Sequence, residues 1–253
     1  MTDLQKAGLG KRIMAAIFDG TLLATLAVGV AVLLSLCFGY DAKADRYISI
    51  MDGYEQQIGV DIQASTAEMT ESELAAHQEK IDAVEEALLK DSEFLSLYEE
   101  LSNLRMLMLS FGLLGAVLII EFFVPLMFGN GQTLGKKIFG IGVMHIEGIR
   151  VSGKQMFIRS VLGKYTIELM LPIYIAIMTL TGGLGMVGLI LLAVLLIAQV
   201  ICLIITRTNA PFHDILASTV TVDFASQHIF EDMEDRNNYI KKVHAERVEH
   251  SDY

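Results

Sequence analysis

The sequence predicts an all-α integral membrane protein with four transmembrane helices, an extracytoplasmic helical insertion and a small cytoplasmic β-hairpin loop. The chain has 253 residues, of which 53% are hydrophobic, more than a soluble domain usually carries. Four apolar runs reach the length of a membrane span, because about 20 residues at about 1.5 Å each cover a hydrocarbon core of about 30 Å. The acidic residues are concentrated in one segment between the first two runs.

The first apolar run, residues 13–38, contains an acidic residue, Asp19. A carboxylate inside a span costs on the order of 2.5–3.5 kcal/mol on insertion scales, so it usually faces the bundle interior or a wet cavity. Arg12 precedes Asp19 by about two helical turns and lies on the same face of a helix. The pair is either a hydrogen-bonding element that only stabilises the bundle or part of a functional site. No small-residue cleavage site follows, so we expect a retained span and not a signal peptide.

Three further apolar runs, 106–128, 165–181 and 186–206, complete the four spans. Lys and Arg residues precede the first span and fill the connection between the second and third, which places both regions in the cytoplasm. We therefore expect a multi-pass protein of the cell (cytoplasmic) membrane, with the lipid bilayer as a partner and both termini cytoplasmic. The expected parts are the N-terminus and first helix (1–40), the acidic extracytoplasmic insertion (41–103), three further helices (104–223) with a cytoplasmic loop (129–164), and a cytoplasmic tail (224–253).

The insertion holds 16 Asp and Glu against 4 Lys and Arg, which accounts for the net charge of −11 of the whole chain. Apolar residues recur in it every seven positions, and Ser65-x-x-Glu68 or Thr70-x-x-Glu73 provides a capping box. We expect a long amphipathic helix from about residue 66 that runs into the second span. The apolar stripe of this helix, within residues 66–103, needs a cover. Segment 42–58, a second subunit or another protein could provide it, because the heptad spacing does not distinguish these alternatives. The stripe consists of Leu74, Ile81, Leu88 and Leu95.

The cytoplasmic loop contains a strand-like pattern. Ile141, Val143 and His145 alternate with other residues, Glu147-Gly148 is typical of a turn, and Ile149 and Val151 follow it. This pattern predicts a β-hairpin within residues 131–152.

The sequence offers no catalytic or metal-binding constellation. HExxH, CxxC and nucleophile-elbow motifs are absent from it, and Cys37 and Cys202 both lie in apolar runs. The glycine-rich stretch 129–137 has Asn130 and Lys137 where a phosphate-binding loop needs Gly and Ser or Thr. We therefore expect no enzyme activity, no cofactor, no metal and no nucleic-acid partner.

Each span carries one polar side chain at a similar depth. Asp19, Glu121 and Gln199 lie about 10 Å from the cytoplasmic edge, and Glu168 lies somewhat nearer to it. Such a cluster can be structural, with each interhelical hydrogen bond contributing about 0.6 kcal/mol. It can also be functional, because mutual repulsion among three carboxylates would leave one of them proton-exchangeable. The candidate transport or ion-binding residues are Arg12, Asp19, Glu121, Glu168 and Gln199.

The combination of these pieces resembles the RDD family, which is named for one arginine and two aspartates. Here they match Arg12, Asp19 and Asp214, and Arg159 resembles the arginine found before the third span of that family. The resemblance covers about 8–40 and 104–223, with 41–103 as an insertion. The positions that match its pattern are Arg12, Asp19, Gly131, Thr133, Gly135, Lys136, Arg159, His213 and Asp214.

The resemblance implies a small polytopic membrane protein and, for some members, ion or proton-coupled transport. Two functional hypotheses follow. In the first, a monovalent cation or proton is transported through the membrane-embedded carboxylate cluster. In the second, the protein is a non-transporting scaffold, sensor or accessory protein that docks a partner through its acidic ectodomain.

Overall fold

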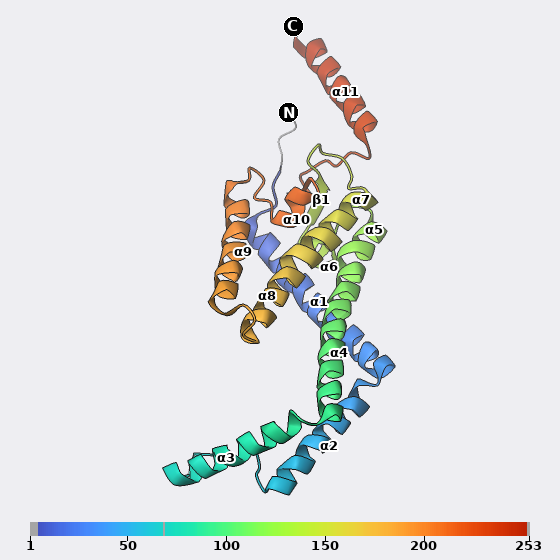
Figure 1. Ribbon diagram of the computed structural model, residues 1–253. Helices are drawn as coiled ribbons and strands as arrows, with labels where there is room; N and C mark the ends of the chain where they lie inside the picture. Colours follow the sequence, from blue (N-terminus) through green and yellow to red (C-terminus); the bar gives the residue numbers. More distant parts are fainter. Residues whose placement is uncertain (1–4, 68, 252–253) are drawn as a thin grey trace. The chain divides into compact units, whose positions relative to one another are not determined.

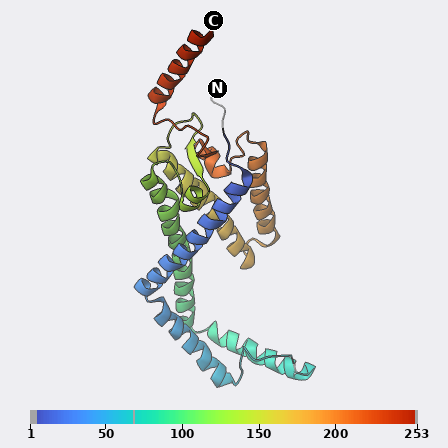
Figure 2. The same ribbon diagram turned by 180° about the vertical axis from the view of Figure 1, so that it is seen from behind.

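The computed structural model describes residues 5–67 and 69–251, and most of them are helical (Figures 1 and 2). Two segments, η1 and η2, have π-helical hydrogen bonding and continue neighbouring α-helices without a break. The elements in chain order are α1 (Leu9–Phe38), α2 (Tyr40–Ile58), α3 (Glu71–Leu88), α4 (Ser92–Val117), η1 (Leu118–Phe123), α5 (Val124–Phe128), α6 (Leu134–Ile138), β1 (Ile141–His145), α7 (Gly153–Phe157), η2 (Ile158–Met170), α8 (Leu171–Leu180), α9 (Gly185–Ile205), α10 (Phe212–Leu216), β2 (Thr219–Asp223) and α11 (Met233–Ser251).

Within residues 5–67 and 69–251, four helical runs are long and apolar enough to cross a membrane, as the sequence predicts. They are Leu9–Phe38, Ser92–Phe128, Gly153–Leu180 and Gly185–Ile205. The third run begins at Gly153, so a helix already forms within the second part of the expected loop 129–164. The end of that loop at the membrane stays a prediction. Ser152 accepts a hydrogen bond from the Gln155 backbone at 3.3 Å, and the Gln155 side chain accepts one from the Ser152 backbone at 3.0 Å. This capping box starts the helix ahead of the apolar run.

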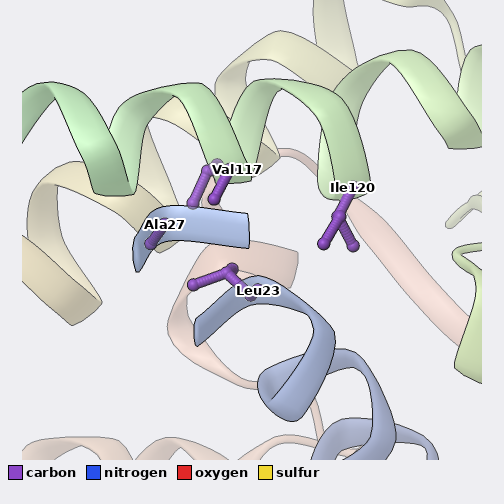
Figure 3. Packing of buried hydrophobic residues seen from close by; sticks show 5 residues of the cluster. Leu23, Ala27, Val117 and Ile120 are labelled. Atoms are coloured by element: carbon purple, nitrogen blue, oxygen red, sulfur yellow. The ribbon is translucent and has the colours of Figure 1, made fainter. Parts of the chain in front are cut away.

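The chain divides into two compact units, one formed by residues up to Ala27 and from Leu113 onward, the other by Val28–Gly112. In the first unit, Leu23 and Ala27 of α1 pack against Val117 and Ile120 on the run that joins α4 to η1 (Figure 3). Ala116 completes this buried cluster. Small and branched side chains at one helical face thus hold the first and second apolar runs together.

In the second unit, the amphipathic helix of the insertion is covered from within the same chain. Val84, Leu88 and Phe94 are buried against apolar residues of α2, and Tyr47 stacks on Phe94 with ring centroids 4.7 Å apart. Of the predicted stripe, Leu88 is buried whereas Leu74 and Leu95 are exposed. Segment 42–58, one of the alternatives left open by the sequence, therefore supplies the cover.

The expectation of one helix from residue 66 into the second span is wrong. Thr70 and Glu73 form the capping box that starts α3, while Glu68 of the alternative box lies outside the described residues. The chain then breaks after Leu88, and Asp91 accepts the backbone N–H groups of Glu93 at 2.8 Å and Phe94 at 3.1 Å. An aspartate that caps free N–H groups in this way starts a new helix, α4.

A pair of leucine substitutions tests this internal cover. We expect Leu88→Ala to lower the free energy of unfolding by about 2–4 kcal/mol, because it opens a cavity in a packed core. Leu74→Ala should change it by less than about 0.5 kcal/mol, because Leu74 is 47% exposed. Thermal unfolding in detergent measures both. Equal losses from the two substitutions would instead indicate a seam between subunits along the whole stripe.

The predicted β-hairpin within residues 131–152 is wrong, although its first strand and turn are present. β1 pairs antiparallel with β2, with Ile141 opposite Asp223 and His145 opposite Thr219, and only a single bridge joins Met144 to Arg150. Pairing of β1 with the distant strand β2 is favoured because Val220 and Val222 of β2 are buried against Met144 of β1. In both views β1 lies beside α10 (Figures 1 and 2).

Candidate functional site

Two threonines of β2, on the face opposite Val220 and Val222, donate hydrogen bonds to a buried carboxylate. Asp214, on α10, is fully buried and accepts hydrogen bonds from the hydroxyls of Thr219 at 2.8 Å and Thr221 at 3.1 Å. Its third partner is Arg159, whose Nε donates to Asp214 Oδ1 at 2.7 Å. Burial alone would raise the pKa of Asp214, but the Arg159 charge and these hydrogen bonds outweigh it and hold this pKa well below its usual range. Asp214 is therefore an ionised anchor.

His213 links this anchor to the third apolar run. Arg159 Nη2 lies 3.2 Å from His213 Nε2, and a guanidinium can only donate, so Nε2 is the acceptor. The proton of the neutral ring is then on Nδ1, which donates to Glu168 Oε2 at 2.8 Å. The His213 backbone also donates to Glu168, at 3.0 Å. A continuous hydrogen-bond chain thus runs from Glu168 through His213 and Arg159 to Asp214.

The π-helical bonding of η2 places its charged residues on one side. At 100° per residue, an α-helix would point Arg159 and Glu168, nine residues apart, in opposite directions. A π-helix closes its hydrogen bonds between residues i and i+5 and so has more than four residues per turn. Nine residues then make roughly two turns. Arg159, Lys164 and Glu168 consequently line the same cavity.

Glu121 meets two lysines in the interior. It lies on η1, is 1% exposed, forms an ion pair with Lys164, and has Lys136 Nζ at 3.7 Å. Ser160 of η2 donates to the Glu121 backbone carbonyl at 2.6 Å, which joins the two π-helical segments. Burial, and then the positive charge of Arg159, lower the pKa of Lys136 to about 8, against the opposing effect of Glu121. Two ammonium groups therefore share one carboxylate, and Lys136 loses its proton at a lower pH than an ordinary lysine.

Asp19 fastens the glycine-rich loop to α1. Its carboxylate accepts the Thr133 hydroxyl and, at 2.8 Å, the Gly135 backbone N–H at the start of α6. A Cβ on Gly135 would lie 2.6 Å from the Ala15 carbonyl oxygen, so only glycine permits this approach. Gly131, with φ +68°, turns the chain before the Thr133 cap. Gly131, Thr133 and Gly135 therefore each have a structural role in this loop.

A cavity of about 340 Å³ adjoins these groups. Arg12, half-buried, lines it, and within residues 5–67 and 69–251 its side chain has no hydrogen bond or ion pair. Gln199 is half-buried on α9 and does not belong to the lining. The lining residues are Leu9, Arg12, Ile13, Ala15, Ala16, Asp19, Lys136, Ile141, Arg159, Lys164, Glu168, Leu203, Pro211, His213, Asp214 and Thr221.

The structure thus brings Arg12, Asp19 and Glu168 to one cavity, with Glu121 beside it through Lys136 and Lys164. The inference from repulsion among carboxylates needs correction, because each carboxylate has its own partners. Sequence reasoning missed Ser160, Thr219 and Thr221. The alternation Thr-Val-Thr-Val at 219–222 is the signal that could have found the two threonines.

A glycine substitution tests the contact between η2 and α10. A Cβ on Gly163 would lie 2.6 Å from His213 Cβ and 2.8 Å from its Cα. We expect Gly163→Ala to lower the free energy of unfolding by about 1–3 kcal/mol, because the helices must move apart. Gly20→Ala, where a Cβ meets nothing within 4 Å, should be neutral or stabilise by up to about 1 kcal/mol. Thermal unfolding in detergent measures both, and a neutral Gly163→Ala would contradict the close packing.

Comparison with known proteins places this arrangement in a family. No curated protein and no solved structure matches the chain. A family model described as RDD family matches residues 6–218, which include all the charged groups of the site. The match extends over most of the sequence, and the chain therefore belongs to the RDD family.

Proposed function

We propose that this RDD-family membrane protein exchanges a monovalent cation for a proton at the cluster of Asp19, Glu121 and Lys136. The proposal places the protein in the cell membrane, in the orientation expected from the basic residues. Both termini then lie in the cytoplasm and residues 41–103 lie outside. The ends of the four apolar runs that adjoin the site then lie at the cytoplasmic face. The chemistry is transport and not catalysis.

The pairing of Glu121 with two lysines carries the proposal. When Lys136 loses its proton, Glu121 keeps Lys164 as a partner, so no carboxylate is left without a counter-charge. The positive charge lost from Lys136 is replaced by a cation that binds the carboxylates nearest to it, Glu121 and Asp19. Charge is conserved at the site, and one proton leaves for each cation that enters. A pKa of about 8 allows this exchange near neutral pH.

Flux in proteoliposomes tests the proposal. Lys136→Arg keeps the positive charge but cannot release its proton, so we expect cation flux driven by a pH gradient to fall to the level of liposomes without protein. Lys137→Arg is the matched control, because the neighbouring Lys137 lies over the Phe128 ring, 3.9 Å from its centroid, and outside the cavity lining. Wild-type flux in Lys136→Arg would contradict the exchange role.

One observation favours a second candidate. Because every carboxylate of the site has partners, the network also suits a static anchor in a scaffold, sensor or accessory protein. The acidic insertion would then dock a partner through residues 66–103. This partner is either a second copy of the chain or another protein. Wild-type protein that moves none of a panel of monovalent cations under a pH gradient would favour this candidate over transport.

A further inference from the structure

The cavity lining contains one basic side chain, Arg12, that forms no ion pair with the described residues. Lys136, Lys164 and Arg159 all form ion pairs with carboxylates. Arg12 forms none among the residues that the structure describes, although the charge of Asp214 acts on it from a greater distance.

A guanidinium presents five N–H donors, and Arg12 is half-buried at the cavity wall, where these donors can reach a ligand. Four basic and three acidic residues line the cavity when His213 is neutral, and Glu121 beside it pairs with two of the lysines, so Arg12 is the basic lining residue without a carboxylate at ion-pair distance among the described residues. An anion is the complementary ligand.

The position of Arg12 indicates where this anion comes from. α1 has 30 residues, or about 45 Å at 1.5 Å per residue, which exceeds a hydrocarbon core of about 30 Å and extends into the headgroup layers. Arg12 lies in the first turn of α1, at the level of lipid phosphates. From there the cavity wall continues toward the core as apolar residues of α1, Ile13 and Ala16, and faces Leu203 near the end of α9.

We propose that this cavity is a binding site for the headgroup of an anionic phospholipid, with the phosphate on Arg12 and the first part of an acyl chain between Ile13, Ala16 and Leu203. Arginine binds phosphate oxygens through two parallel N–H groups. The apolar wall favours a lipid over free phosphate, since a free ion would leave this surface uncovered. A headgroup without its own ammonium leaves the phosphate charge to Arg12, the basic side chain of the lining that lacks an ion pair among the described residues. The site does not depend on the exchange of cations and adds a lipid requirement to the protein.

Native mass spectrometry and thermal unfolding of the full chain in detergent test the site. Phosphatidylglycerol should bind wild-type protein with one tight site and raise its Tm, whereas phosphatidylcholine and inorganic phosphate at the same concentrations should not. Arg12→Gln should weaken phosphatidylglycerol binding at least tenfold. Lys11→Gln is the matched control, because Lys11 is exposed, pairs with Asp223 at 2.6 Å and does not line the cavity.

Arg12→Lys keeps the charge and loses the paired N–H groups, so it should bind with intermediate affinity, and it provides the comparison if Arg12→Gln does not fold. Equal affinity of wild-type and Arg12-substituted proteins for phosphatidylglycerol would overturn the site. So would equal binding of phosphatidylcholine, and displacement of the lipid by inorganic phosphate would identify a free-anion site instead.

Discussion

Arg159→Ala is expected to lower the free energy of unfolding by about 3–5 kcal/mol, because it leaves a buried charge without its partner. The side chains of Arg159 and Asp214 are 3% and 0% exposed, and Asp214 would keep only its two threonine hydroxyls. His213 would lose its donor at Nε2 as well. The hydrogen-bond chain from Glu168 to Asp214 would therefore be interrupted at its centre.

The matched control is Arg46→Ala. Arg46 forms a salt bridge of the same length with Glu93, but both side chains are more than half exposed, at 57% and 53%. We expect this loss to stay below about 1 kcal/mol. The double variant Arg159→Met with Asp214→Asn should be less destabilised than the sum of its single variants, since neither charge is then left alone. Similar Tm shifts for Arg159→Ala and Arg46→Ala would contradict the burial of the pair.

Glu121→Gln is expected to be nearly as damaging as Arg159→Ala, and its effect should depend strongly on pH. It leaves the ammonium groups of Lys164 and Lys136 facing a neutral amide in a buried site, a loss of about 3–5 kcal/mol at pH 6. Because Glu121 raises the pKa of Lys136, its removal should move that pKa below about 8. The lysine can then lose its proton near neutral pH.

The direction of the pH dependence follows from where the proton binds more tightly. The pKa of Lys136 is about 8 in the folded protein against 10.5 for an ordinary lysine, so between these values the unfolded chain binds more protons and stability rises with pH. In Glu121→Gln this rise should begin at a lower pH. Thermal unfolding from pH 6 to 10 measures it, with the exposed Glu86→Gln as control. A destabilisation that does not vary with pH would contradict the role of Lys136.

Local signals in the sequence predicted much of this architecture. Hydropathy found the four apolar runs, and the Thr70-x-x-Glu73 pattern marked the start of α3. The position of Asp19 within a span indicated a buried carboxylate, which the structure places at the start of α6. These features depend on residues close in the sequence. Leaving apolar side chains exposed or polar groups unpaired costs free energy, so such features can be recognised locally.

The remaining features depend on contacts between distant segments. The alternation of residues in β1 did not determine whether it pairs with residues 149–151 or with 219–223, because both segments contain apolar residues. The π-helical bonding of η2 was invisible to a reading at 100° per residue, which separates Arg159 from Glu168. The pairing of Glu121 with Lys136 arises only when the loop after α5 folds back against η1 and η2. Reasoning from depth alone therefore brought the carboxylates together without the lysines that neutralise them.

Proton release on cation addition tests the proposed exchange most directly. Purified wild-type protein in weakly buffered detergent at pH 7, where Lys136 is protonated, should release about one proton per chain when Na⁺ or another monovalent cation binds, because the cation displaces the proton of a lysine whose pKa is about 8. Lys136→Arg should release none, and Lys137→Arg should match the wild type. Proton release by Lys136→Arg equal to that of the wild type, or no release by the wild type with any monovalent cation, would contradict the account.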